Sequence, residues 1–99
     1  MEQHAVVLDV SRYRPADGKR DEMLAEMKRI AERASAADGC FGAQVCVSSS
    51  DKDAIVAVSR WKSRAALEAF AKEVEAIGSR ERLMSLLNGR AEHENLIPI

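Results

Sequence analysis

The sequence has 99 residues, of which 46% are hydrophobic and 31% are charged, a balance typical of globular proteins rather than of disordered chains. Fifteen basic residues against 16 acidic ones leave a formal net charge of -1, so no broad positive field is available to bind a nucleic-acid backbone. This length predicts one domain spanning residues 1–99.

The sequence also argues against a membrane or metal-binding protein. No apolar run approaches the ~20 residues that a membrane span needs, and the N-terminus lacks the pattern of a secretory signal. We therefore expect a cytoplasmic protein. Cys40 and Cys46 lie on one predicted strand, ~20 Å apart at ~3.3 Å per residue, too far apart for a disulfide bond. Neither has a CxxC partner or a nearby His, so we expect no metal site.

The first half of the chain predicts a strand followed by a helix. Residues 5–13 alternate between two faces, as a half-buried strand does. The segment 15-PADG-18 predicts a turn, with Asp17 as the N-cap of a helix that ends before Gly39. Apolar side chains recur along this helix at helical spacing, at Met23, Met27, Ile30 and Ala34.

The second half predicts three more strands. Residues 41–47 and 54–61 form two strands joined by the polar segment 48–53, which is typical of a hairpin. Ser63 then caps a second helix that Gly78 closes, and a short third helix follows from Ser79. Residues 91–99 predict a last strand, with Pro98 at its end. The element order is β-α-β-β-α-β, which predicts an α+β ferredoxin-like fold with a four-stranded antiparallel sheet and the helices on one face.

The predicted sheet has an apolar face that its own helices do not cover. Burying one such aliphatic side chain is worth about 1.5–3 kcal/mol, and five of them about 10 kcal/mol, so a monomer seldom leaves them in water. We expect a second copy of the sheet to cover this face in a two-fold homodimer. The side chains concerned are Val6, Leu8, Val10, Val56 and Val58.

The side chains on the other face of the predicted sheet, which alternate with the apolar set along each strand, are smaller and more polar. Asp9, Ser11 and Tyr13 belong to this face on the first strand, and Ala57 and Ser59 on the third. A few polar groups in an apolar cleft are typical of a small-molecule site. The alternative is that side chains of the helices fill the space and leave no cleft.

Three segments carry a resemblance to a known family: 15-PADG-18, 38-DGCFGAQV-45 and above all 61-WKSRAALEAF-70. Together with the element order, they make residues 5–98 resemble the antibiotic biosynthesis monooxygenase family. The resemblance implies a dimeric α/β barrel with a cleft between helices and sheet. In some members this cleft oxygenates polycyclic phenols without metal or flavin.

The sequence departs from the family pattern at three positions. Quinone-forming members have an Asn four residues before the tryptophan, where this chain has Ala57. Haem-degrading relatives use a His on the second helix, and residues 62–90 contain none. They also use an Asn near the end of the first strand, where this chain has Ser11.

We predict Trp61, Asp9 and His93 as catalytic residues. Trp61 would form a flat wall for an aromatic substrate, with a plain core position as the alternative. Asp9 is charged within a strand that is otherwise typical of a buried one, so it is a candidate base or one half of a salt bridge. His93 on the last strand suits proton transfer near neutral pH, unless it lies on the surface.

Several further residues are candidates for substrate binding. Ser11 and Ser59 share the cleft face and would orient a ligand oxygen, unless they are ordinary strand serines. Tyr13 would close the mouth of the pocket or pack on the first turn. Phe70 on the second helix would face the sheet. Arg80 and Arg82 on the short helix would attract an anionic substrate, or would be solvated charges.

The predicted function is cofactor-independent monooxygenation of a phenolic or quinol-type small molecule. Two alternatives stay open: a non-catalytic dimer that binds a small molecule, and an isomerase of small oxygenated metabolites that uses His93 or Asp9 as a proton shuttle. RNA-binding domains share the element order but display aromatic residues where this chain has valines and a leucine. We therefore expect no nucleic-acid partner.

Overall fold

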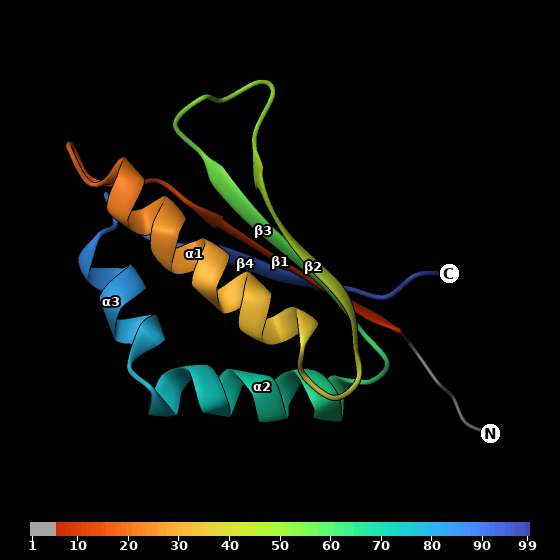
Figure 1. The fold of residues 1–99 in the computed structure, drawn as a ribbon. Helices are drawn as coiled ribbons and strands as arrows, with labels where there is room; N and C mark the ends of the chain where they lie inside the picture. Colours follow the sequence, from red (N-terminus) through yellow and green to blue (C-terminus); the bar gives the residue numbers. More distant parts are fainter. Residues whose placement is uncertain (1–5) are drawn as a thin grey trace.

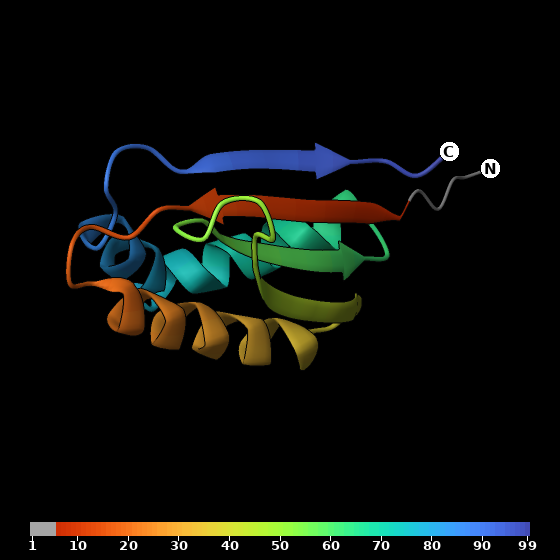
Figure 2. The same cartoon turned by 90° about the horizontal axis from the view of Figure 1, so that it is seen from above.

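The computed structural model describes residues 6–99, and Ala5, at the start of the predicted first strand, lies outside them. The strands pair antiparallel in the order β2-β3-β1-β4, and the helices lie on one side of this sheet (Figures 1 and 2). The predicted ferredoxin-like α+β fold is therefore confirmed. Its elements are β1 (Val7–Tyr13), α1 (Arg20–Ser35), β2 (Cys40–Val47), β3 (Ile55–Trp61), α2 (Arg64–Ala76), α3 (Ser79–Ser85) and β4 (Glu92–Leu96).

The strand register confirms the predicted division into two faces. Asp9 lies opposite Ser59 on β3 and opposite Asn95 on β4, while Ser11 lies opposite Ala57 and His93. Because side chains directly opposite one another in a sheet share a face, the polar set from three strands collects on the helix side.

Helix α1 begins two residues later than the sequence predicts. Its N-cap is Lys19, without a side-chain cap hydrogen bond, and Asp17 is exposed. The reason is that the chain stays extended after β1: Ala16 N donates to Leu86 O at 2.8 Å, and Asn88 N donates to Arg14 O at 2.7 Å. This pairing carries the chain past Asp17 before the helix can start.

Helix α2 begins as predicted. Ser63 Oγ accepts from Ala66 N at 3.1 Å, which satisfies one of the free N–H groups of the first turn. Gly39 fits against this turn in a left-handed conformation, with φ +85°, and a Cβ there would lie 2.8 Å from Ala66 Cβ. Only glycine suits both the conformation and the close approach.

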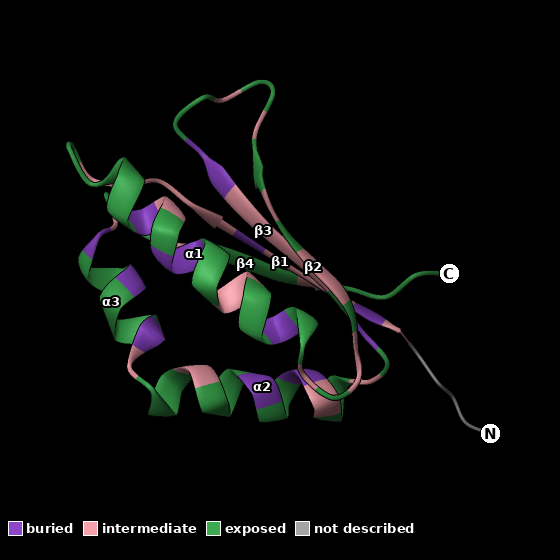
Figure 3. Cartoon of the chain, viewed as in Figure 1, coloured by how far each residue is buried: buried purple, intermediate pink, exposed green. Residues whose placement is uncertain are grey.

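Two clusters of buried side chains hold the helices on the sheet. Figure 3 marks the buried residues along the helices and strands. One cluster lies beneath α2 and the other beneath α3, and Ile30 of α1 packs against both. The first comprises Val7, Ala34, Trp61, Leu67 and Phe70, and the second Met23, Met27, Ile55, Leu83 and Leu86.

A buried carboxylate joins α1 to α3. Glu26 is only 2% exposed, and its Oε1 accepts from Arg29 Nη2 at 2.5 Å and from Arg82 Nε at 3.3 Å. Burial acts to raise the pKa of Glu26, but hydrogen bonds from Arg29, Ser79 and Arg82 outweigh it, and the pKa lies below its ordinary value. The ionised carboxylate therefore fixes the start of α3 against α1.

The outer face of the sheet is not covered by any other part of the described chain. Val10 lies directly opposite Val58 at its centre, and both are half-buried. Charged side chains border them, with Arg60 on β3 and Glu94 on β4, both exposed. The apolar patch expected from the sequence thus exists in the single chain.

Candidate active site

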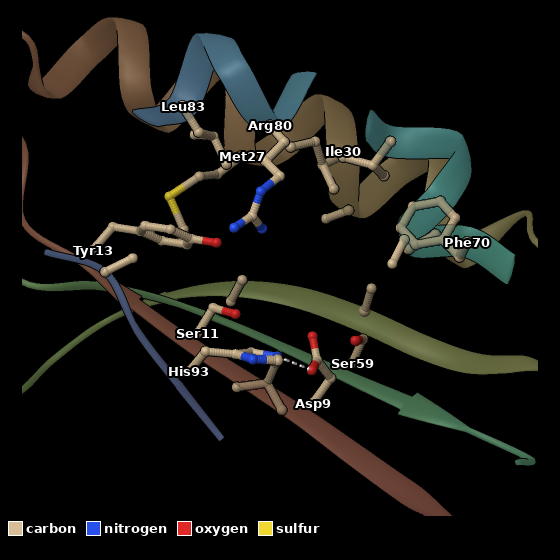
Figure 4. Close-up of a pocket in the computed structure, with 18 of the residues that line it drawn as sticks. Asp9, Ser11, Tyr13, Met27, Ile30, Ser59, Phe70, Arg80, Leu83 and His93 are labelled. Atoms are coloured by element: carbon tan, nitrogen blue, oxygen red, sulfur yellow. Dashed lines mark hydrogen bonds and ion pairs between the residues drawn. The ribbon is translucent and has the colours of Figure 1, made fainter. Parts of the chain in front are cut away.

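A cavity of about 730 Å³ lies between the sheet and the helices, within the range of ~300–1,000 Å³ typical of small-molecule sites. The helices supply an apolar roof: Met27 and Ile30 from α1, Phe70 from α2 and Leu83 from α3 (Figure 4). The alternative that helix side chains fill this space is therefore wrong, because they line it without filling it.

The strands supply a polar floor. Asp9 and Ser11 come from β1, Ser59 from β3 and His93 from β4 (Figure 4). The pleat brings them together, since Asp9 pairs with Ser59 and Ser11 with His93 across the sheet. Polar groups from three strands thus face an apolar roof, an arrangement that orients a ligand with a few oxygen atoms.

Asp9 and His93 contact each other on this floor. His93 Nε2 lies against Asp9 Oδ1 (Figure 4). Since a carboxylate only accepts hydrogen bonds, Nε2 must carry the proton, and in the neutral ring Nδ1 then holds the free lone pair. The carboxylate side chain is 21% exposed and the imidazole 56%, so the ring is open to a ligand while its partner is largely enclosed. The pair has the geometry of an oriented base.

Tyr13 and Arg80 form a second polar group at another part of the cavity. The Arg80 guanidinium points into the cavity beside the Tyr13 hydroxyl (Figure 4). Burial raises the pKa of Tyr13 above its ordinary value of 10.0, Asp9 raises it further, and a hydrogen bond with Ser11 and the charge of Arg80 act against this. The phenol therefore stays protonated at neutral pH and can donate a hydrogen bond to a ligand.

Trp61 does not line the cavity. Its side chain is 0% exposed, its Nε1 donates to Ser59 Oγ at 2.8 Å, and its ring centroid lies 5.3 Å from that of Phe70. The flat wall expected from Trp61 is instead provided by Phe70, which lines the cavity in front of it. Trp61 occupies the core position named as its alternative.

Arg64 and Asn95 are among the lining residues that the sequence-based prediction missed. Asn95 lies two residues after His93 on the same strand, so the alternation of side chains could have placed both on the cavity face. Arg64 is the first residue of α2, and no local pattern indicates that its side chain reaches the cavity.

Residues 6–99 contain no group of three His, Cys, Asp or Glu side chains positioned to hold a metal ion. In the same part of the chain Cys40 and Cys46 are free thiols. No helix among these residues has the length and apolar character to cross a membrane.

Comparison with known proteins is consistent with this geometry. The family model for antibiotic biosynthesis monooxygenase matches residues 7–76, and no curated protein matches the sequence. Among solved structures, Rv0793 from Mycobacterium tuberculosis is similar with a TM-score of 0.87 at 22% identity, covering 95% of each chain. A conserved protein from Methanosarcina mazei has a TM-score of 0.85 at 15% identity, covering 94% of this chain and 92% of that one. A variant of SnoaB, a cofactor-independent oxygenase from Streptomyces nogalater, has a TM-score of 0.78 at 18% identity, covering 92% of this chain and 90% of that one.

Proposed function

The chain belongs to the antibiotic biosynthesis monooxygenase family, and from that premise we propose that it is a cofactor-independent monooxygenase of a phenolic or quinol-type substrate. The observation that carries the proposal is the Asp9–His93 pair on the polar floor of an apolar cavity. A substrate of this class itself supplies the electrons that reduce O2, so the protein has to supply a base, an orientation and a site with little water.

The first step is proton removal. His93 Nδ1 takes the proton of the substrate hydroxyl, and Asp9 stabilises the imidazolium that forms. The resulting phenolate is held against Phe70 and the apolar side chains of α1. Tyr13 and Arg80 donate to a second substrate oxygen, which stabilises negative charge as it spreads over the ring.

The electron-rich ring carbon then reduces oxygen. A C–O bond forms between that carbon and O2, and the imidazolium returns its proton to give a hydroperoxide. The O–O bond breaks as water leaves with the hydrogen of the same carbon, and a carbonyl remains. One phenol and one O2 thus give one quinone and one water, and all four electrons that reduce O2 come from the substrate.

A second candidate function uses the same pair. An imidazole that takes a proton from one carbon can return it to a neighbouring carbon, which isomerises a small oxygenated metabolite without oxygen. The Asp9–His93 contact supports this reaction as well. Oxygen consumption separates the two, since only the monooxygenase needs O2.

We also propose a homodimer formed through the outer face of the sheet. The support is the uncovered patch of Val6, Leu8, Val10, Val56 and Val58, all half-buried in the single chain. The free thiols of Cys40 and Cys46 fit a reducing compartment, and we propose a cytoplasmic location.

An oxygen electrode tests the proposed activity, with 1,4-dihydroxynaphthalene and anthrone as substrates. The wild-type protein should consume one O2 per quinone formed. His93→Ala should lower kcat by about 10²–10⁴-fold, the usual contribution of a general base. Glu75→Ala, an exposed change on α2, should leave the rate unchanged. No oxygen uptake by the wild-type protein, or an unchanged rate in His93→Ala, would contradict the proposal.

A further inference from the structure

Asp9 has a second partner besides His93, and that partner leads to helix α2. With its amide oriented to satisfy both neighbours, Asn95 Nδ2 donates to Asp9 Oδ1 at 2.7 Å, and Asn95 Oδ1 accepts from Arg64 Nη1 at 3.1 Å. A continuous chain of polar contacts therefore runs from α2 through β4 to the catalytic pair proposed above: Arg64, Asn95, Asp9, His93.

We propose that Asn95 and Arg64 are positioning residues for the Asp9–His93 pair, an inference that rests on the proposed function of that pair. Asn95 lies directly opposite Asp9 in the pairing of β1 with β4. Its amide N–H and the imidazole N–H therefore approach the same carboxylate oxygen from neighbouring positions. Two donors on one oxygen leave the carboxylate a single orientation, and that orientation selects which nitrogen of His93 carries the proton.

Arg64 strengthens this arrangement because its charge acts on the acceptor end of the Asn95 amide. A cation bonded to the carbonyl oxygen polarises the amide and makes its N–H a better donor. Arg64 also comes from the helical layer, whereas Asn95 comes from the sheet. The contact therefore connects the two layers that enclose the cavity, and the orientation of Asp9 depends on α2 keeping its place.

The other charged and titratable groups around His93 do not duplicate this role. Tyr13 on β1, Glu68 on α2, Arg80 on α3 and Arg90 before β4 line the same cavity, but among the described contacts none bonds to Asp9. Asn95 is thus the second donor to the carboxylate within residues 6–99.

The tautomer of His93 is the decisive readout, since a merely structural residue would not change it. In long-range ¹H–¹⁵N NMR spectra at a pH where the ring is neutral, the wild-type protein should show one tautomer with the proton on Nε2. Asn95→Ala should show averaged signals of the two nitrogens, because Asp9 is then free to rotate. The chain has two histidines, and His93→Gln assigns the signals.

Arg64→Gln provides a second and milder variant in case Asn95→Ala does not fold. It keeps the Asn95 amide but removes the charge behind it, so we expect partial averaging of the same signals. Asn88→Ala and Arg20→Gln are matched controls, because Asn88 and Arg20 are exposed and lie outside the cavity lining. Both should keep the wild-type tautomer.

Kinetics supply the second arm of the test. With a substrate that the wild-type protein oxidises, Asn95→Ala should lower kcat on the order of tenfold to a hundredfold, the effect of misplacing a reacting group, while KM stays near the wild-type value. An unchanged tautomer in Asn95→Ala and Arg64→Gln would overturn the inference, even if the oxygenase activity is real. Absent oxygen uptake would instead overturn the proposed function and leave the NMR result to decide the positioning role.

Discussion

The indole of Trp61 donates its N–H to Ser59 Oγ at 2.8 Å, so the tryptophan acts on the cavity through the serine in front of it. The ring itself is fully buried and packs against Phe70. Ser59 and Phe70 both line the cavity, and Trp61 supports each of them from behind.

Replacing Trp61 should therefore affect stability first. We expect Trp61→Ala to lower the free energy of unfolding by about 3–5 kcal/mol, the usual loss for a large buried aromatic residue. Trp61→Phe keeps most of the packing but leaves Ser59 without its donor, and should cost less. Urea denaturation measures both. A loss below about 1 kcal/mol in Trp61→Ala would contradict the assigned core position.

The single tyrosine of the chain provides a direct test of the electrostatics of the cavity. Because burial raises the pKa of Tyr13, its ultraviolet absorbance should change at a pH above the ordinary midpoint of 10.0. The ionised phenol is disfavoured in the folded state, so folding stability should fall as the pH rises above 10.0.

Two substitutions should move this Tyr13 titration in opposite directions. Arg80→Gln removes a charge that lowers the pKa of Tyr13, so the midpoint should rise. Asp9→Asn removes a charge that raises the pKa, so the midpoint should fall. Shifts of the same sign in both variants would contradict the placement of Tyr13 between these two groups.

The fold and the polar floor could be predicted from sequence because both follow from short-range periodicity. The pleat repeats every two residues, so the alternation within β1 is enough to sort Asp9, Ser11 and Tyr13 onto one face. The register then aligns Ser59 and His93 with them. Ser63 was equally predictable, since an N-cap contacts a backbone group only three residues away.

The remaining features depend on long-range packing. Asp17 does not take its predicted cap position because residues 14–16 pair with residues 86–88, which lie at the other end of the chain. Trp61 shares the parity of the cavity face, but it ends β3 beneath Leu67 and Phe70, which cover it. Arg64 reaches Asn95 only because α2 packs on the helix side of the sheet. None of these contacts produces a pattern in the nearby sequence from which it could be predicted.

Glu26 should make stability depend on pH in the acid range. Burial acts to raise its pKa, but hydrogen bonds from Arg29, Ser79 and Arg82 lower it below the ordinary value of 4.5. The ionised form is favoured by folding, so this stabilisation is present above 4.5 and is lost as the pH falls through the lowered pKa. Thermal unfolding between pH 3 and pH 7, which spans about the range over which carboxylates titrate, measures the loss.

A variant isolates the contribution of this carboxylate. Glu26→Gln cannot ionise, so its stability should change less with pH across the acid range than that of the wild-type protein, and at neutral pH it should be less stable by about 1–3 kcal/mol. Glu32→Gln, an exposed change on the same helix, should retain the wild-type pH dependence. If the stability of Glu26→Gln and of the wild-type protein fell equally with decreasing pH, other groups would be responsible for the acid sensitivity.

The proposed homodimer makes the last prediction. Val58 lies at the centre of the outer face, directly opposite Val10, and a charge there would be buried without a partner in the dimer. We expect Val58→Asp to weaken dimerisation by about a hundredfold or more, since an unpaired buried charge costs several kcal/mol. Sedimentation equilibrium at micromolar concentration measures it. Ile77→Asp, the same kind of change at an exposed position after α2, should leave the dimer intact. Equal association of both variants would mean that another surface joins the subunits, and a monomeric wild-type protein would mean that these valines face water.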